Sequence, residues 1–178
     1  AKAFLLAISE NPDINSSWDD ALQQVHIMKS INLGIAAATP RGLIVPNTKT
    51  AQSLPLQHLA AALTALVGEA KAGTTPTAAM VGGTVTITNI GSLGVDSGSP
   101  ILHPGSAAIL AFGASPPRPW VVGKRIMIHA VATFQFAFNP RRVNGARGAP
   151  ALHSCSRGAE SGRPGAGGRS PWPWPRSA

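Results

Sequence analysis

The residues best suited to chemistry in this chain surround Pro140. The run Asn139-Pro140-Arg141-Arg142-Val143-Asn144-Gly145 places two carboxamides and two guanidinium groups around a proline. A proline side chain has no nitrogen that can accept a proton, so a general base is impossible at position 140.

A hydroxyl group at Thr88 lies near the end of the most regular strand pattern. Thr84-Val85-Thr86-Ile87-Thr88-Asn89 alternates with period two, which predicts a strand. A hydroxyl held on a strand can donate a hydrogen bond to a developing negative charge. Thr88 can be such a donor, although β-branched residues are also favoured on strand surfaces for reasons of packing alone.

The histidines and the single cysteine do not form a second candidate site. His26 and His129 fall in predicted strands, and His103 precedes a proline in a loop. His153 and Cys155 are close in sequence, whereas catalytic imidazole–thiol pairs usually come from distant positions. The scattered histidines show no metal-ligand spacing, so we expect no metal.

Composition favours one domain in a reducing compartment. The chain has 178 residues, 44% of them hydrophobic, without an apolar run of membrane-spanning length. One cysteine excludes an internal disulfide, and we expect a cytoplasmic protein. The first residues, 1–8, have the pattern of a helix interior, which predicts that the chain begins partway through a larger polypeptide.

Several elements are predicted to position these residues. Helical spacing predicts helices over 1–10 and 54–71, the second with Ser53 as its cap and Gly73 at its end. Residues 15–20 have the composition of a polar connection. Strands are expected at 25–27, 31–36, 43–46, 84–89, 107–113 and 133–138, with a hairpin over 120–128.

The last thirty or so residues differ from the rest in composition. The overall charge is +8, and residues 139–178 hold seven Arg and one Glu. We expect residues 1–148 to form a partial catalytic domain and 149–178 to be a disordered Arg/Gly/Pro-rich tail, because the tail lacks apolar periodicity. Trp172 and Trp174 offer stacking platforms for nucleic acid, but we favour a tail without that partner.

Several runs together resemble a known family. They occur in the same order over more than a hundred residues, at 32–46, 82–96, 101–110, 118–122 and 139–145. The chain resembles the catalytic domain of the dihydrolipoamide acyltransferases, the core component of 2-oxoacid dehydrogenase complexes. Its resemblance covers roughly residues 1–148.

The resemblance implies a fold and an assembly. The expected fold is an α/β two-layer sandwich like that of chloramphenicol acetyltransferase, with helices on one face of a large mixed sheet. Family members form trimers that build a larger core. Coenzyme A and a lipoyl group carried by another domain enter opposite ends of a channel between subunits.

The resemblance also implies roles for particular residues. Thr88 matches the family's oxyanion-donating Ser or Thr, while Pro140 stands at the position of the catalytic His in Asp-His-Arg-x-x-Asp-Gly. Asn144 replaces the second Asp of that motif. We therefore expect an acyltransferase-family domain with impaired activity, or alternatively a structural pseudoenzyme subunit. Two origins of Pro140 stay open: an inactive protein, or a sequence altered from about this residue onward.

Overall fold

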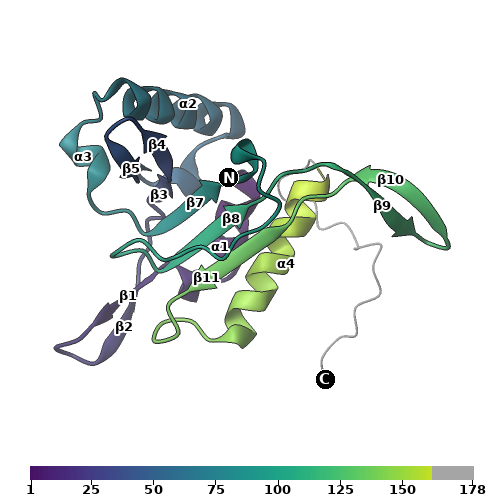
Figure 1. Cartoon of the computed structure of the whole chain (residues 1–178). Helices are drawn as coiled ribbons and strands as arrows, with labels where there is room; N and C mark the ends of the chain where they lie inside the picture. Colours follow the sequence, from purple (N-terminus) through teal and green to yellow (C-terminus); the bar gives the residue numbers. More distant parts are fainter. Residues whose placement is uncertain (162–178) are drawn as a thin grey trace.

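A mixed five-stranded sheet forms the centre of the molecule (Figure 1). The structure is a computed structural model that describes residues 1–161. The sheet order is β11-β8-β7-β3-β6, where β7 runs parallel to both β3 and β8, and β6 and β11 are antiparallel edges. The strands are β3 Leu33–Ile35, β6 Asn47–Thr48, β7 Val85–Asn89, β8 Ala108–Phe112 and β11 Phe134–Phe138.

Helices α1 Lys2–Glu10 and α4 Gly145–Ser161 lie side by side on one face of this sheet (Figure 1). Because side chains alternate along a strand, Val85 and Ile87 face the helices together with Leu110 of β8. Phe4, Leu5 and Ile8 of α1 pack into the same core. The predicted fold class, helices on one face of a mixed sheet, is confirmed.

The β11 phenylalanines reach this core as expected from their alternation. Phe134, Phe136 and Phe138 pack against the buried cluster, and Phe136 meets Phe4 edge to face with ring centroids 5.9 Å apart. Because β11 lies beside β8, the phenylalanines just before Pro140 lie on the sheet face that the helices cover.

Helix α2 Leu56–Ala72 packs against β4 and β6 beyond the far edge of the sheet. It ends at Gly73, whose φ of 72° is the left-handed conformation predicted for a C-terminal stop. The prediction of Ser53 as its cap is wrong, since Pro55 occupies the N-cap position and the Ser53 hydroxyl donates to Thr50 O. Short helices are η1 Pro12–Ile14, η2 Ala51–Ser53, α3 Thr77–Met80 and η3 Gly91–Leu93.

Three hairpins extend from the central layers. They pair β1 Ser16–Asp19 with β2 Gln24–Ile27, β4 Ala37–Thr39 with β5 Gly42–Ile44, and β9 Pro117–Val122 with β10 Arg125–Ala130. The prediction of a polar connection over 15–20 is therefore wrong. Trp18 pairs there with Val25, and cross-strand pairing overrides the polar composition.

The predicted boundary at residue 148 is also wrong for the residues that follow it directly. Residues 149–161 belong to α4, and the rest of the predicted tail, 162–178, lies outside the described residues. Gly148, Ala151 and Cys155 are buried at helical spacing against the core, although Pro150 and several glycines weaken the helix. Tertiary packing of this narrow stripe outweighs the poor intrinsic propensity.

Candidate functional site

Thr88 is held by the pairing of β7 with β8, in register with Ala111. Its side chain lies on the sheet face opposite the helices, together with Thr84 and Thr86. The Thr86 hydroxyl lies 3.0 Å from Ser106 Oγ, whereas the Thr88 hydroxyl has no hydrogen-bond partner among residues 1–161. Thr88 thus presents a free donor on a half-buried strand surface.

Pro140 occupies a hydrogen-bonded turn directly after β11. The N–H of Asn139 donates to Ala107 O at 3.1 Å, and that of Arg142 donates to Asn139 O at 3.0 Å. The Asn139 side chain adds an acceptor for the Arg141 N–H at 2.9 Å. Asn in the first position and Pro in the second are favoured in such turns, so the backbone accommodates Pro140 without loss.

Asn144 caps the N-terminus of α4. Its Oδ1 accepts the N–H of Arg147 at 3.0 Å, and its backbone carbonyl accepts the N–H of Gly148 at 3.0 Å. The preceding residue, Val143, is buried in the core. A carboxamide oxygen caps a helix as well as a carboxylate does, so Asn144 preserves the structure of this position.

Thr88 and Pro140 lie far apart within a single chain. Phe138 is in register with Ala108 at the start of β8, while Thr88 is in register with Ala111 near the end of β8. Since Pro140 lies two residues beyond Phe138, the two positions are separated by about 15 Å along the strands. Each end of the sheet therefore carries one half of the predicted site.

A pocket of about 280 Å³ opens on the same sheet face as Thr88, near the start of β7. Thr84, Thr86, Ser106 and His103 contribute its polar lining. A larger cavity of about 590 Å³ lies on the helix side, between the β9–β10 hairpin, Phe112 and the end of α4. The smaller pocket is therefore the one that shares a surface with the free hydroxyl.

The histidines remain dispersed in the structure. His103 lines the smaller pocket and His129 the larger, while His26 Nε2 lies 3.7 Å from Asp19 Oδ2 on the β1–β2 hairpin. Within residues 1–161 no three His, Cys, Asp or Glu side chains gather as a metal site would require. No helix in that part of the chain has the length and hydropathy needed to cross a membrane.

The environment of Cys155 makes its thiol unreactive. The residue is 3% exposed in α4. Burial raises the pKa of the Cys155 thiol to about 11, against the weaker opposing effect of the N-terminal ammonium. A thiol reacts as a thiolate, so the geometry gives Cys155 no role as a nucleophile.

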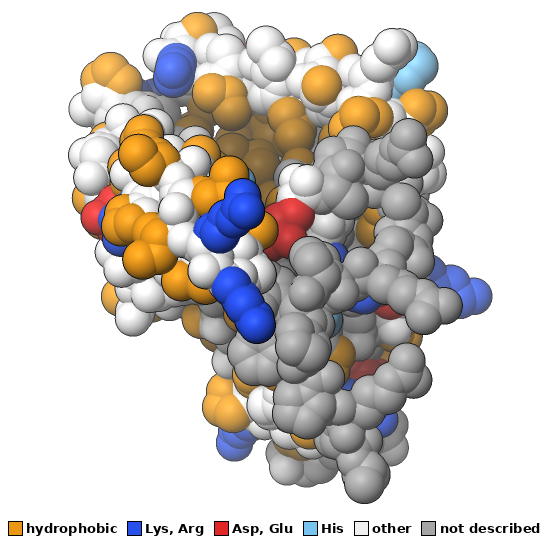
Figure 2. Space-filling view, turned by 90° about the vertical axis from the view of Figure 1, so that its right-hand side faces the viewer, with side chains coloured by type: hydrophobic (Ala, Val, Ile, Leu, Met, Phe, Trp, Pro, Cys, Tyr) orange, Lys and Arg blue, Asp and Glu red, His pale blue; other side chains and the backbone are white. Residues whose placement is uncertain are grey.

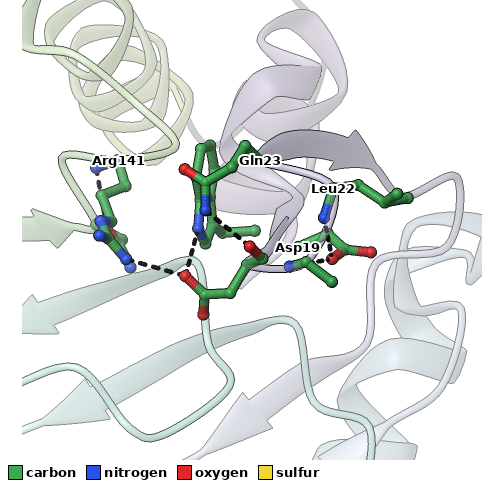
Figure 3. A network of polar contacts seen from close by, with 8 residues as sticks. Asp19, Leu22, Gln23 and Arg141 are labelled. Atoms are coloured by element: carbon green, nitrogen blue, oxygen red, sulfur yellow. Dashed lines mark hydrogen bonds and ion pairs between the residues drawn. The ribbon is translucent and has the colours of Figure 1, made fainter.

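A polar cluster links the β1–β2 hairpin to the Pro140 turn (Figure 3). Arg141 Nη1 donates to Asp20 Oδ1 at 3.2 Å, and the guanidinium lies 5.6 Å from the centre of the Trp18 ring. Trp18 Nε1 donates to the same carboxylate oxygen at 2.8 Å. Sequence reasoning missed this cluster because Arg141 is 121 positions from Asp20.

The β9–β10 hairpin projects from the body of the molecule (Figure 1), and Figure 2 looks onto that side. Apolar side chains gather on this surface. On the hairpin itself the exposed large apolar residues are Trp120, Val121, Val122, Ile126, Met127 and Ile128. Isolated two-stranded hairpins are marginally stable in water, so this one is a candidate contact surface.

The family model of the 2-oxoacid dehydrogenases acyltransferase catalytic domain matches residues 1–161. The chain belongs to this acyltransferase family. The match includes the thirteen residues of α4 that follow residue 148, in agreement with the packing of that helix.

Curated relatives of this acyltransferase domain are much longer proteins. The acetyltransferase component of the Acholeplasma laidlawii pyruvate dehydrogenase complex is 40% identical over 83% of this chain and 27% of its own length. The succinyltransferase component of the Bos taurus mitochondrial 2-oxoglutarate dehydrogenase complex is 30% identical over 91% of this chain and 36% of its own. The chain therefore spans about a quarter to a third of these relatives.

Solved structures agree with the fold. A probable dihydrolipoamide acetyltransferase from Listeria monocytogenes superposes with a TM-score of 0.85 at 26% identity, covering 96% of this chain and 71% of its own. The Azotobacter vinelandii dihydrolipoamide acetyltransferase gives 0.83 at 28% identity, covering 88% and 65%. A chain from the cubic core of a pyruvate dehydrogenase complex gives the same values.

Proposed function

We propose that this chain is part of an acyltransferase that moves an acyl group between dihydrolipoamide and coenzyme A, and that Pro140 impairs the transfer. Thr88 supplies the oxyanion donor in this scheme. Deprotonation of the attacking thiol requires a base, and position 140 has none. The observation that carries the proposal is the turn at Pro140, which keeps its hydrogen bonds while lacking an imidazole.

The Azotobacter vinelandii enzyme supports the choice of residues. Crystallographic and enzymatic work on that protein concerns the role of a serine, a histidine and an asparagine in its catalytic mechanism. These three stand 52 and four positions apart, which is also the spacing from Thr88 to Pro140 and from Pro140 to Asn144. By this spacing, Asn144 matches an asparagine of that enzyme, although the family motif led us to expect an aspartate there. Relative to that enzyme, Thr88 and Asn144 keep a hydroxyl and a carboxamide, and the imidazole is replaced.

Assembly is part of the same proposal. Thr88 and Pro140 lie at opposite ends of the sheet, so a complete site needs neighbouring copies, as in a homotrimer and a larger core. The lipoyl group would arrive on another domain, and we propose a cytoplasmic location. A chain of the cubic core of a pyruvate dehydrogenase complex, similar in structure, supports a multimeric state.

A structural role is the second candidate. The intact turn, the capped α4 and the exposed β9–β10 hairpin preserve the features that packing needs, although the base is missing. A pseudoenzyme subunit would join a core without transferring acyl groups.

Acyl exchange between acyl-coenzyme A and dihydrolipoamide tests the impairment. The natural chain should turn over close to background, and Pro140→His should raise the rate by about 10²- to 10⁴-fold, the usual contribution of a general base. Pro140→Ala is the matched control, because it removes the ring without adding a base, and it should stay near background.

Two results would count against the proposal. Turnover of the natural chain near that of an intact homologue would refute the impairment. A folded, assembled Pro140→His variant without any gain would instead favour the structural subunit.

A further inference from the structure

Three hydrogen bonds between side chains and the backbone close the turn between β1 and β2. Asp19 Oδ1 accepts the N–H groups of Ala21 and Leu22 at 2.9 and 3.0 Å, and Gln23 Nε2 donates to Asp20 O at 2.7 Å (Figure 3). The Leu22 N–H is the main cause that lowers the pKa of the Asp19 carboxyl, with His26 contributing less. These contacts fix the backbone from which the Asp20 carboxylate projects.

Arg141 binds to this turn through two kinds of contact. Its guanidinium donates to Asp20 Oδ1 and lies against the face of Trp18, while the Trp18 ring itself donates to the same oxygen. An arginine that makes both an ion pair and a cation–π contact is held in a narrower range of orientations than one that makes the ion pair alone. Trp18 and Asp20 of the hairpin thus hold the Arg141 side chain in one orientation.

The rest of the Pro140 turn is attached to the body of the protein. Asn139 bonds to Ala107, Val143 is buried, and Arg142 Nη1 donates to Ser16 O at 3.2 Å. Pro140 and Arg141 are exposed between these attachments. Within the corner, Asn139 Oδ1 accepts the Arg141 N–H; among residues 1–161, the contacts that tie the corner to another element are those of the Arg141 side chain with Trp18 and Asp20.

We propose that Trp18 and Asp20 are positioning residues: they hold Arg141 and thereby set the direction of the side chain at position 140. The significance of that direction rests on the proposed function. The Arg141 and Asp20 side chains are 64% and 78% exposed, and exposed ion pairs add little to folding stability. The effect should therefore appear in the order of the turn and not in the stability of the fold.

Amide hydrogen exchange on the full chain tests directly whether Trp18 and Asp20 hold the Pro140 turn in place. Asp20→Ala and Trp18→Leu should each speed exchange of the Arg141 and Arg142 amides by about three- to tenfold, while β7 amides stay unchanged. Asp20→Glu should restore much of the protection. Asp96→Ala, which breaks the exposed Arg118–Asp96 pair elsewhere, is the matched control and should leave these amides unaffected.

The same substitutions in a Pro140→His background test whether the direction of the side chain at position 140 affects catalysis. A misdirected imidazole should lower kcat by about three- to tenfold with KM unchanged, and Asp20→Glu should recover it. Unchanged exchange of the Arg141 and Arg142 amides, or faster exchange with kcat unaltered, would overturn the positioning role. If Pro140→His shows no turnover although the exchange results hold, the proposed function fails and the hold of the hairpin on Arg141 stands.

Discussion

The backbone at Pro140 and the chemistry of thiol activation require different residues. A proline restricts φ to the value that the second turn position already has, and its missing N–H has no partner to lose in this turn. Replacing it by histidine should cost only the small stability that proline gains by restraining the unfolded chain, about 0.4–1 kcal/mol. The position is thus structurally ready to receive an imidazole.

The buried thiol of Cys155 should make stability depend on pH in the alkaline range. Its pKa is raised from 9.0 to about 11 in the folded chain, so above pH 9 the unfolded chain loses this proton first. The Cys155 contribution is complete below pH 9 and is lost as the pH rises toward 11. Urea unfolding of the natural chain and Cys155→Ala should show a steeper alkaline loss in the natural chain; parallel pH curves would contradict this.

The strand that carries Thr88 could be predicted from sequence, but the surroundings of the candidate site could not. The alternation over 84–89 predicts the strand, and proline chemistry excludes a base at position 140, whereas the roles of these two positions in a site come from the family resemblance and stay predictions. Trp18, Asp20 and Arg141 come together only because β11 ends beside the β1–β2 hairpin. Such contacts depend on the order of strands in the sheet, which no local pattern contains.

Among the elements, α4 depends on close packing more than on helix propensity. At Gly148 an added Cβ would overlap the Phe138 ring, whereas at Gly145 it would meet nothing within 4 Å. Gly148→Ala should lower the free energy of unfolding by about 1–3 kcal/mol through overpacking.

Gly145→Ala is the control within the same helix. It should be neutral or stabilising by up to about 1 kcal/mol, because alanine is the better helix former. Urea denaturation monitored by circular dichroism measures both. Equal stability of the two variants would mean that the contact with Phe138 does not limit α4.

The elements were predictable where a buried face repeats regularly. The strand over 84–89 and the helix over 54–71 have such repeats, and both form. For α4 the buried positions are Gly148, Ala151 and Cys155, small residues that carry almost no apolar signal. The polar residues of β1 indicate a loop when they are considered alone. They form a strand because they pair with β2, and that pairing is not visible in the β1 sequence.

At the scale of the whole molecule, the β9–β10 hairpin should govern assembly. Ile126 and Ile128 are 76% and 79% exposed on one face of β10. Placing lysine at both positions should reduce the size of the assembly, because burying two added charges at a contact is costly.

Size-exclusion chromatography with light scattering measures this effect. Ala61→Lys with Ala65→Lys adds the same charge to exposed positions of α2 and should leave the assembly unchanged. A natural chain that is a monodisperse monomer, or a hairpin variant that assembles fully, would contradict the prediction.

The placement of Thr88 and position 140 at opposite ends of one sheet has a consequence for mixtures of variants. A chain with Thr88→Ala and Pro140→His lacks the hydroxyl, and the natural chain lacks the imidazole. Each chain alone should therefore show acyl transfer close to background. Co-assembled, the hydroxyl of one copy can face the imidazole of its neighbour, and two defective chains should complement each other. Turnover should then rise with the mixing ratio to a maximum near equal amounts, and a mixture no more active than its parts would mean that each catalytic centre belongs to a single chain.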